Sequence, residues 1–268
     1  SGVVLANSFF NTLIGGKAPD ITEFDAQTLF PTAGTLKKFY VGLSVAPGAG
    51  ESRIFTIRLN GVAQSLAVTI SDTATTGNMT TNPVTIAAGD KVTIVQASVA
   101  AAASIAKFGI VFLPDTQGEW FTSATTDDPT SSTAVEFQQL TAGDTLLTAT
   151  ENEQHGLAQA TTAKKIFVNL ATSPGAANSW IFTLREALAN TGLTVTISDT
   201  NTSGNAAVDE AIAADALVNL SIDAMAGAAT SASQIAILFY NAPLGGGGKG
   251  AYAGGFANAN RFDRRGFN

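Results

Sequence analysis

The chain has 268 residues, enough for two domains of ordinary size, and only 13% of its residues are charged. Its formal net charge of −7 argues against a nucleic-acid-binding body, because phosphate contacts need clustered Lys and Arg side chains. The lack of cysteine excludes disulfides, Cys-ligated zinc and thiol nucleophiles, and no apolar run reaches the ~18–20 residues that span a bilayer. We therefore expect no cofactor and no membrane contact, and a low-charge surface that neighbouring subunits cover.

Alternation of apolar and polar residues with the period of a β-strand dominates the first half of the chain. Two apolar stretches, Val3–Phe10 and Ile21–Leu29, come first, and Ser71–Thr81 is predicted to be a polar loop. Asn60-Gly61 is the dipeptide that most favours a tight hairpin, and Ala88-Gly89-Asp90 is a second predicted turn. The alternating segments predict strands at 39–45, 54–59, 66–70, 84–86, 92–95 and 108–113.

The second half of the chain repeats the first. Residues 37–112 align without gaps on 164–239, and 29 of the 76 pairs are identical. The longest identical run is Val-Thr-Ile-Ser-Asp-Thr, at 68–73 and again at 195–200. The repeats keep the apolar spacing and the turn residues, and no cluster of catalytic residue types recurs in both. The duplication therefore predicts architecture and gives no direct indication of chemistry.

The two copies differ in their turns and in the segments around them. In the second copy the Asn-Gly hairpin is replaced, and Arg185–Ala189 is predicted to form a helical turn. The Ala-rich stretches 97–106 and 224–232 contain Gly, Ser or Thr and precede a final strand, so we expect loops there. Val3–Phe10 and Ile21–Leu29 ahead of the first copy, and further strands at 135–137 and 145–147 ahead of the second, bring each copy to an eight-stranded jelly roll. The predicted fold is all-β: two tandem jelly-roll β-sandwiches, 1–118 and 119–243, followed by an arm at 244–268.

The C-terminal arm differs in kind from the repeats. It begins with the Gly-rich run 245–248, and its formal charge is +3, so the rest of the chain carries −10. We expect the arm to leave its own module and dock on a neighbouring copy, with aromatic side chains as anchors and arginines as polar clamps. The predicted assembly residues are Tyr252, Phe256, Arg261, Phe262, Arg264, Arg265 and Phe267.

Residues that invite a catalytic or ligand-binding interpretation are few. Two carboxylates at a suitable separation suffice for glycoside hydrolysis, and carboxylate oxygens also bind Ca²⁺, although no EF-hand pattern is present. All the candidates lie in Thr-, Ser- and Gly-rich linkers, where we expect solvated carboxylates, and His155, the one histidine, is predicted to be a solvated loop residue. The acidic candidates are Asp127, Asp128, Asp144, Glu151 and Glu153.

Three other features have a structural explanation as well as a functional one. Asp72 and Asp199 recur in Ser-Asp-Thr, which predicts a polar turn in which Asp accepts backbone N–H groups; the alternative is a contact loop. Gly245–Gly250 contains Gly-Lys without the Ser/Thr and helix of a phosphate-binding loop. Trp120 and Trp180 are potential sugar platforms, but packing in a core or an interface is the stronger expectation.

The first repeat contains Phe39-Tyr40-Val41, Pro47-Gly48-Ala49-Gly50 and the stretch 55–61, with a mid-module Asn-Gly and a late Ala-Gly-Asp. With this pattern both repeats, the first most strongly, resemble the C1q/TNF-like jelly-roll modules of bacteriophage structural proteins. The resemblance implies a β-sandwich that trimerises or packs side by side on a virion.

From these observations we expect a non-enzymatic virion structural protein, a capsid or capsid-decorating subunit. Its partners would be copies of itself, as a trimer or lattice, and other virion proteins. One alternative is a receptor- or glycan-binding fibre or adhesin domain. Another is a subunit of an extracellular filament in which Val3–Phe10 is donated as a strand to a neighbour's sheet.

Overall fold

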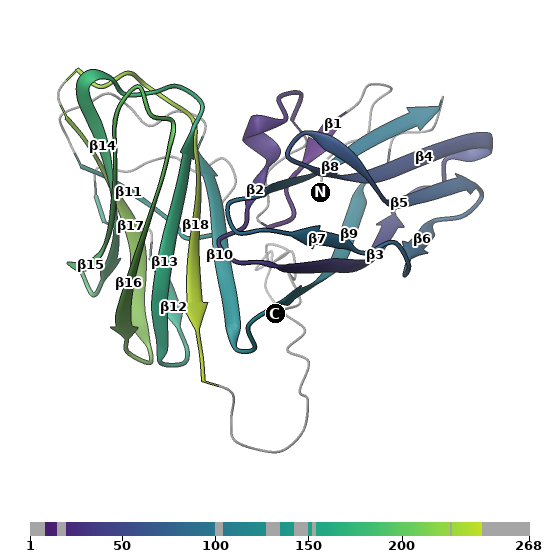
Figure 1. Cartoon of the computed structure of the whole chain (residues 1–268). Coiled ribbons are helices and arrows are strands. Elements are labelled where there is room, and N and C mark those ends of the chain that lie inside the picture. Colours follow the sequence, from purple (N-terminus) through teal and green to yellow (C-terminus); the bar gives the residue numbers. More distant parts are fainter. Residues whose placement is uncertain are drawn as a thin grey trace, which may run out of the picture.

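The fold is built almost entirely from antiparallel strands. A computed structural model describes residues 9–14, 20–99, 104–126, 135–141, 150–151, 154–225 and 227–242. Within these residues the only helical element is a single 3-10 turn, η1 (Phe24–Ala26), so the all-β prediction is confirmed. In the same residues no helix has the length and apolarity needed to cross a membrane. The strands form four sheets (Figure 1).

Two sheets come from the first half of the chain and form the N-terminal sandwich. One has the order β1-β8-β4-β5, with β2 also paired to β8, and in the other β3 pairs with β6, β7 and β9. The strands are β1 (Phe9–Asn11), β2 (Thr28–Leu29), β3 (Gly34–Leu43), β4 (Gly48–Leu59), β5 (Val62–Asp72), β6 (Thr76–Met79), β7 (Val84–Ile86), β8 (Lys91–Val99) and β9 (Ala106–Pro114).

The other two sheets form the C-terminal sandwich. One has the order β11-β17-β14-β15, with β12 also paired to β17, and the other has the order β10-β18-β13-β16. The strands are β10 (Glu119–Thr126), β11 (Glu136–Gln138), β12 (His155–Leu157), β13 (Thr161–Leu170), β14 (Gly175–Glu186), β15 (Ala189–Asp199), β16 (Ser203–Ile212), β17 (Ala216–Ala224) and β18 (Ser233–Tyr240).

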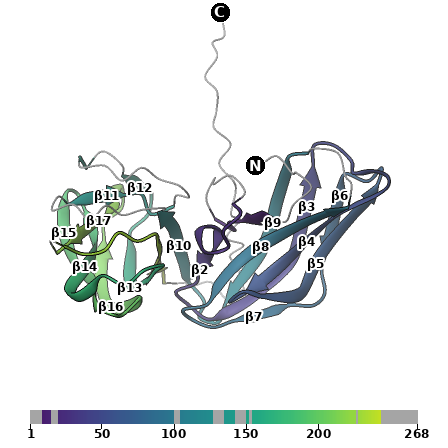
Figure 2. The same cartoon turned by 90° about the horizontal axis from the view of Figure 1, so that it is seen from above.

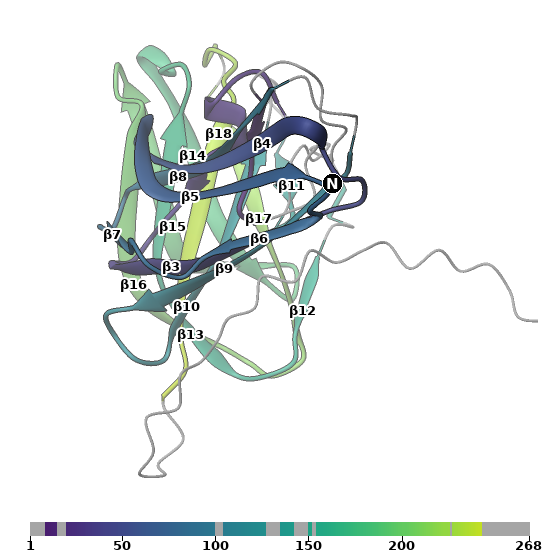
Figure 3. The same cartoon turned by 90° about the vertical axis from the view of Figure 1, so that its right-hand side faces the viewer.

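The strands of the two sandwiches recur with the spacing of the sequence repeat. β3, β4 and β5 and their counterparts β13, β14 and β15 begin and end 127 residues apart, and so do β1 and β11. The pairing order is also shared, except that β10 has no counterpart among the described strands of the N-terminal sandwich. Strands of the two sandwiches run crosswise to each other, as the side view in Figure 3 shows.

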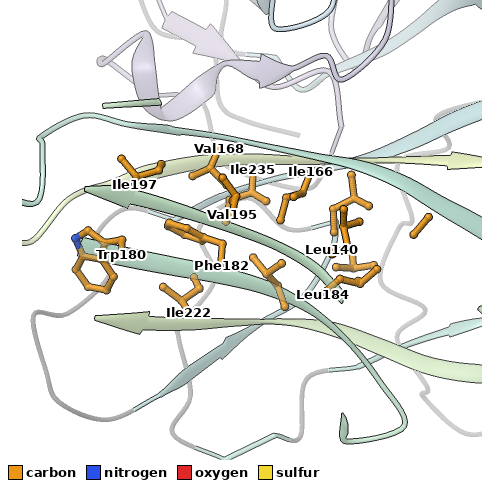
Figure 4. Close-up of a cluster of buried hydrophobic side chains, with 14 of the residues drawn as sticks. Leu140, Ile166, Val168, Trp180, Phe182, Leu184, Val195, Ile197, Ile222 and Ile235 are labelled. Carbon is orange, nitrogen blue, oxygen red and sulfur yellow. The ribbon is translucent and has the colours of Figure 1, made fainter. Parts of the chain in front are cut away.

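Each sandwich encloses its own apolar core. Inward-facing positions alternate along the strands, as at Phe55 and Ile57 on β4 and at Phe182 and Leu184 on β14, all of them fully buried. Figure 4 shows the C-terminal core, with Trp180 at one end and Leu140 toward the other. The period of two that predicted the strands is therefore the period of burial.

The two motifs that carried the resemblance lie next to each other in the fold. Asn60 and Gly61 both have positive φ, 50° and 81°, as a tight hairpin between β4 and β5 requires. The Asn60 amide donates to Asp90 Oδ1 (2.7 Å), and the backbone N–H of Lys91 donates to Asn60 Oδ1 (2.9 Å). The Asn-Gly hairpin and the Ala-Gly-Asp turn thus hold each other in place.

In the second copy the predicted helical turn at Arg185–Ala189 is wrong. β14 and β15 meet in the same two-residue hairpin, with Ala187 and Leu188 at φ 48° and 69°. A side chain with a Cβ is costly in this conformation, and the strand pairing on both sides enforces it nevertheless. The prediction was wrong because the pairing register of β14 with β15, and not the local preference of Ala187 and Leu188, sets the conformation of the turn.

Replacing Ala187-Leu188 with Asn-Gly is therefore expected to raise the free energy of unfolding by about 1–2 kcal/mol, because it removes left-handed strain. Leu188 is largely exposed, so little packing is lost. Chemical denaturation checks this. Gly61→Leu is the control in the first copy, because it introduces left-handed strain and keeps the Asn60 hydrogen bonds, and it should destabilise by about 1 kcal/mol. Equal stability of all three chains would contradict the interpretation.

Two other local predictions are wrong, and a third is correct for one of its two stretches. The predicted loop 71–81 contains the strand β6, which pairs with β3. His155 lies in the short strand β12, half-buried and paired with Val218, and is not a solvated loop residue. The described part of the Ala-rich stretch 224–232 is a loop after Ala224, as predicted, whereas β8 continues to Val99 within the stretch 97–106.

Candidate assembly surfaces

The two sandwiches are joined by a buried, hydrogen-bonded interface. Residues 24–32 of the N-terminal sandwich lie against the outer face of β10 and β18 (Figure 2). The Gln234 amide donates to Gln27 Oε1 (2.9 Å) and to the carbonyl of Phe24 (2.6 Å), and the backbone N–H of Leu29 donates to Ser123 Oγ (3.3 Å). Gln234 and Ser123 are buried, so this part of the interface is closely packed.

Strand β10 contributes to both cores at once. Its Trp120 stacks on Phe239 of the C-terminal core, with ring centroids 4.4 Å apart. The next residue, Phe121, points the other way and packs on Phe30 (4.8 Å) and Phe112 (5.7 Å) of the N-terminal core. Alternation along a strand sends successive side chains to opposite faces, so β10 fastens one sandwich to the other.

A polar groove of about 290 Å³ runs along this junction. The N-terminal sandwich contributes Leu29, Gly89 and Lys91, and the C-terminal sandwich contributes residues 167–169 and 203–205. The polar residues that line the groove are Asn169 and Asn205, which carry amides, Ser203, which carries a hydroxyl, and Lys91, which carries an ammonium group.

Strand β9 lies at an edge of its sheet among the described strands. Its counterpart β18 lies between β13 and β10, whereas among the described residues β9 pairs only with β3. Ile110 and Phe112 on β9 remain 9% and 7% exposed, against 1% and 0% for their counterparts Ile237 and Phe239. Gly109, the residue before Ile110, is exposed, whereas its counterpart Ala236 is buried. The described part of the N-terminal sandwich therefore presents an uncovered strand edge.

A bidentate ion pair, which we call the Arg–Glu clamp, recurs in both sandwiches. In the first, Arg58 Nε donates to Glu23 Oε1 (2.7 Å) and its Nη2 to Glu23 Oε2 (3.0 Å), with the guanidinium 5.8 Å from the Phe10 ring centroid. These hydrogen bonds raise the pKa of Arg58 above its ordinary value. The pair ties the chain ahead of β3 to the β4–β5 hairpin.

The second Arg–Glu clamp has the same chemistry, but its glutamate is displaced by one residue from the position that the sequence repeat predicts. Arg185 Nε and Nη2 donate to Glu151 Oε1 (2.7 Å) and Oε2 (2.8 Å), with the guanidinium 5.3 Å from Phe137. Arg185 and Phe137 lie 127 residues after Arg58 and Phe10, but Glu151 lies 128 after Glu23. An ungapped comparison therefore aligns Glu23 with Thr150 and misses the pair. The signal that was present is an Arg kept in both copies of a chain so poor in charge.

Replacing Arg185 with Ala is expected to lower the free energy of unfolding by about 2 kcal/mol, because it leaves Glu151, whose side chain is only 12% exposed, without its bidentate partner. Urea denaturation followed by circular dichroism measures this. Asp209→Asn, which neutralises the exposed partner of Lys164, is the control and should change stability by less than about 0.5 kcal/mol. Equal effects of the two substitutions would show that the clamp is energetically unimportant.

The Ser-Asp-Thr aspartates stabilise turns, as predicted. Asp72 Oδ1 accepts the backbone N–H of Gly50 (2.8 Å), and Asp199 Oδ1 accepts that of Ala177 (2.9 Å). Both aspartates have positive φ, 56° and 59°. Each joins the end of one strand to the start of its neighbour, and their recurrence is explained by that role.

The acidic candidates do not form a catalytic centre in the described part of the chain. Glu151 is engaged by Arg185 and is not the solvated carboxylate that the sequence predicted, while Asp127, Asp128, Asp144 and Glu153 lie outside the described residues. No group of three or more potential metal-ligating side chains occurs in the described ranges.

The tryptophans are packed, as the stronger expectation held. Trp180 is buried in the C-terminal core, and its indole N–H donates to the carbonyl of Ala229 (3.1 Å). Trp120 is part-buried and donates to Asn241 Oδ1 (2.5 Å). Neither ring is a free platform for a sugar.

The two predicted arms fall largely outside the described residues. The C-terminal assembly residues, Tyr252 to Phe267, all do, and so do Val3–Ser8. Of the segment Val3–Phe10 that the filament hypothesis would donate, Phe9 and Phe10 pair with β8 of their own chain. That part of the donated strand is therefore not available to a neighbour.

No protein-family model and no curated protein matches this chain.

Proposed function

We propose that this chain is a non-enzymatic virion structural protein, a capsid or capsid-decorating subunit, that assembles through contacts between its own copies. The two sandwiches are, in this proposal, duplicated jelly-roll modules of residues 1–118 and 119–243. The expected location is the virion, and the expected partners are further copies, as a trimer or lattice, together with other virion proteins.

Support for the jelly-roll assignment comes from the strand order. Counted along the chain with β11 and β12 as one strand, the eight strands of the C-terminal sandwich lie in the orders 1-8-3-6 and 2-7-4-5. Two four-stranded sheets connected in this way form the eight-stranded jelly roll that viral capsid proteins use, and that lectin domains also use. Fold alone does not decide between these functions.

The single observation that carries the proposal is the uncovered edge of β9. An unpaired strand edge is an aggregation hazard unless something covers it. Charged side chains protect strand edges against pairing with other chains, and only 13% of the residues of this protein are charged. A neighbouring copy that covers the edge removes the aggregation hazard without added charge, and such a contact is what an assembly subunit requires.

Sedimentation velocity of the full-length chain over rising concentration tests this proposal. We expect a discrete oligomer in reversible equilibrium with the monomer. A monodisperse monomer throughout the range, with both termini intact, would contradict it.

A glycan-binding fibre domain is the second candidate, and the groove between the sandwiches is the observation that favours it. Amides, a hydroxyl and the Phe167 ring are suited to recognising a sugar. Glycan-array binding that is lost on Asn205→Ala would support this candidate, and an array without signal would leave it unsupported.

A further inference from the structure

We propose that the edge of β9 receives an added antiparallel strand from the C-terminal segment, residues 251–262, of a second copy of the chain. The inference deepens the proposed function and rests on it, because it names the segment that covers the uncovered edge.

The position of β10 indicates where the donated strand comes from. β10 follows β9 after the short turn 115–118, leaves the N-terminal sandwich, and pairs with β18 over eight residues of the next sandwich. β18 is the counterpart of β9, so the segment after β18 corresponds to β10. The 127-residue offset places that counterpart at 246–253, whose first five residues are glycine or lysine, and the proposed strand begins at 251, after them. If this segment also pairs with the last strand of the next sandwich, it reaches the N-terminal sandwich of another copy, where β9 has an unpaired edge among the described residues.

The sequence of the segment has the alternation that such a strand needs. From 251 to 262, the aromatic residues Tyr252, Phe256 and Phe262 all fall at even positions, and the odd positions hold mostly alanine. In an extended chain the aromatics share one face and the small residues the other. The aromatic face would lie on the same side of the sheet as Ile110 and Phe112, which are buried but keep 9% and 7% exposure. The alanine face lies on the side of Gly109.

The distribution of charge favours the same head-to-tail arrangement. Residues 119–243 contain 13 acidic and 3 basic residues, a net charge of −10, whereas residues 1–118 contain 7 of each. A contact between two C-terminal sandwiches would bring like charges together. A C-terminal sandwich against the neutral N-terminal sandwich of the next copy avoids that repulsion. Contacts between two different surfaces produce a closed ring if the rotation from one copy to the next returns to the first copy, and a filament if it does not.

The segment 251–262 could instead dock on β9 of its own chain, and an experiment must distinguish this arrangement from docking on a second copy. The backbone N–H of Asn241 donates to the carbonyl of Gly118 (3.0 Å), so the segment leaves beside the β9–β10 turn of its own chain. Cysteine crosslinking distinguishes the two cases cleanly, because the chain contains no cysteine of its own.

The experiment mixes two full-length chains that carry one cysteine each. One chain carries Gly109→Cys, where a Cβ meets no atom closer than 4.0 Å. The other carries Ala251→Cys, Ala253→Cys or Ala257→Cys, which samples the register. The control for the first chain is Thr69→Cys, exposed on the edge strand β5. A chain that carries both Gly109→Cys and Ala253→Cys reports docking within one molecule.

We expect a disulfide-linked pair of chains with Gly109→Cys and at least one of the three partners, and at least tenfold less with Thr69→Cys. Hydrogen exchange of residues 106–114 should slow on assembly, and Tyr252→Ser with Phe256→Ser should abolish the slowing. Crosslinks only within the double-cysteine chain, or no crosslink and no change in exchange in an assembled sample, would overturn the inference. Assembly or virion location without the crosslink would leave the proposed function standing, and the crosslink in a protein absent from virions would refute the function alone.

Discussion

Replacing Gly204 with Val is expected to lower the free energy of unfolding by about 2–3 kcal/mol, because it overpacks a closed corner of the C-terminal sandwich. A Cβ at Gly204 would lie 2.9 Å from Val195 Cγ2 and 3.1 Å from Ile197 Cγ1. Both neighbours are buried core side chains with little room to move. β16 crosses β15 at this point, and only a glycine permits the approach.

Gly77 has the same role in the N-terminal sandwich, where a Cβ would lie 2.7 Å from Val68 Cγ1 and 3.0 Å from Ile70 Cγ1. Gly77→Val should therefore destabilise to a similar extent. Gly42→Val is the matched control, since a Cβ on this strand glycine would meet nothing within 4 Å. Denaturation midpoints measure all three variants. A loss of stability in Gly42→Val equal to that of the other two would show that valine itself, and not the close packing, is responsible.

Deleting residues 245–268 is expected to abolish assembly and leave the fold intact. All the strands that the structure describes end at or before Tyr240, so the deletion removes none of their pairings. In our proposal the segment supplies aromatic anchors and arginine contacts of on the order of 1–3 kcal/mol each. The loss of two such contacts already weakens association by at least about tenfold.

Sedimentation velocity of the truncated and full-length chains at matched concentration measures the effect, and circular dichroism confirms the fold. A variant with Arg261, Arg264 and Arg265 changed to Gln separates the contribution of charge from that of the aromatics, and should weaken association without abolishing it. A truncated chain that associates as the full-length chain does would disprove the role of the arm.

Regular alternation made the strands predictable, and tertiary constraints made the exceptions unpredictable. Phe55 and Ile57 face the core as their period requires, and the same alternation turns Arg53 inward, where it is fully buried and its pKa is lowered by burial. Its counterpart in the other copy is Trp180. Nothing in local preference distinguishes an inward Arg from an inward Trp, because the difference depends on what packs around it.

The assembly surface was less accessible to sequence reasoning than the fold. The Asn60-Gly61 hairpin follows from a dipeptide preference, whereas Ala187-Leu188 adopts the same turn against its preference because two long strands are paired on either side. β10 was not among the predicted strands, and its contribution to both cores depends on the relative position of the two sandwiches. That β9 lacks a second partner among the described residues emerges only when the pairings of the two copies are compared in three dimensions.

The most direct test of the central claim is a quantitative mass-spectrometric inventory of purified virions from the source of this chain. Our account predicts that the chain is present in every preparation, in many copies per particle and in a fixed ratio to the other structural proteins. Its absence from purified particles, with abundant protein in the remaining fractions, would contradict the account.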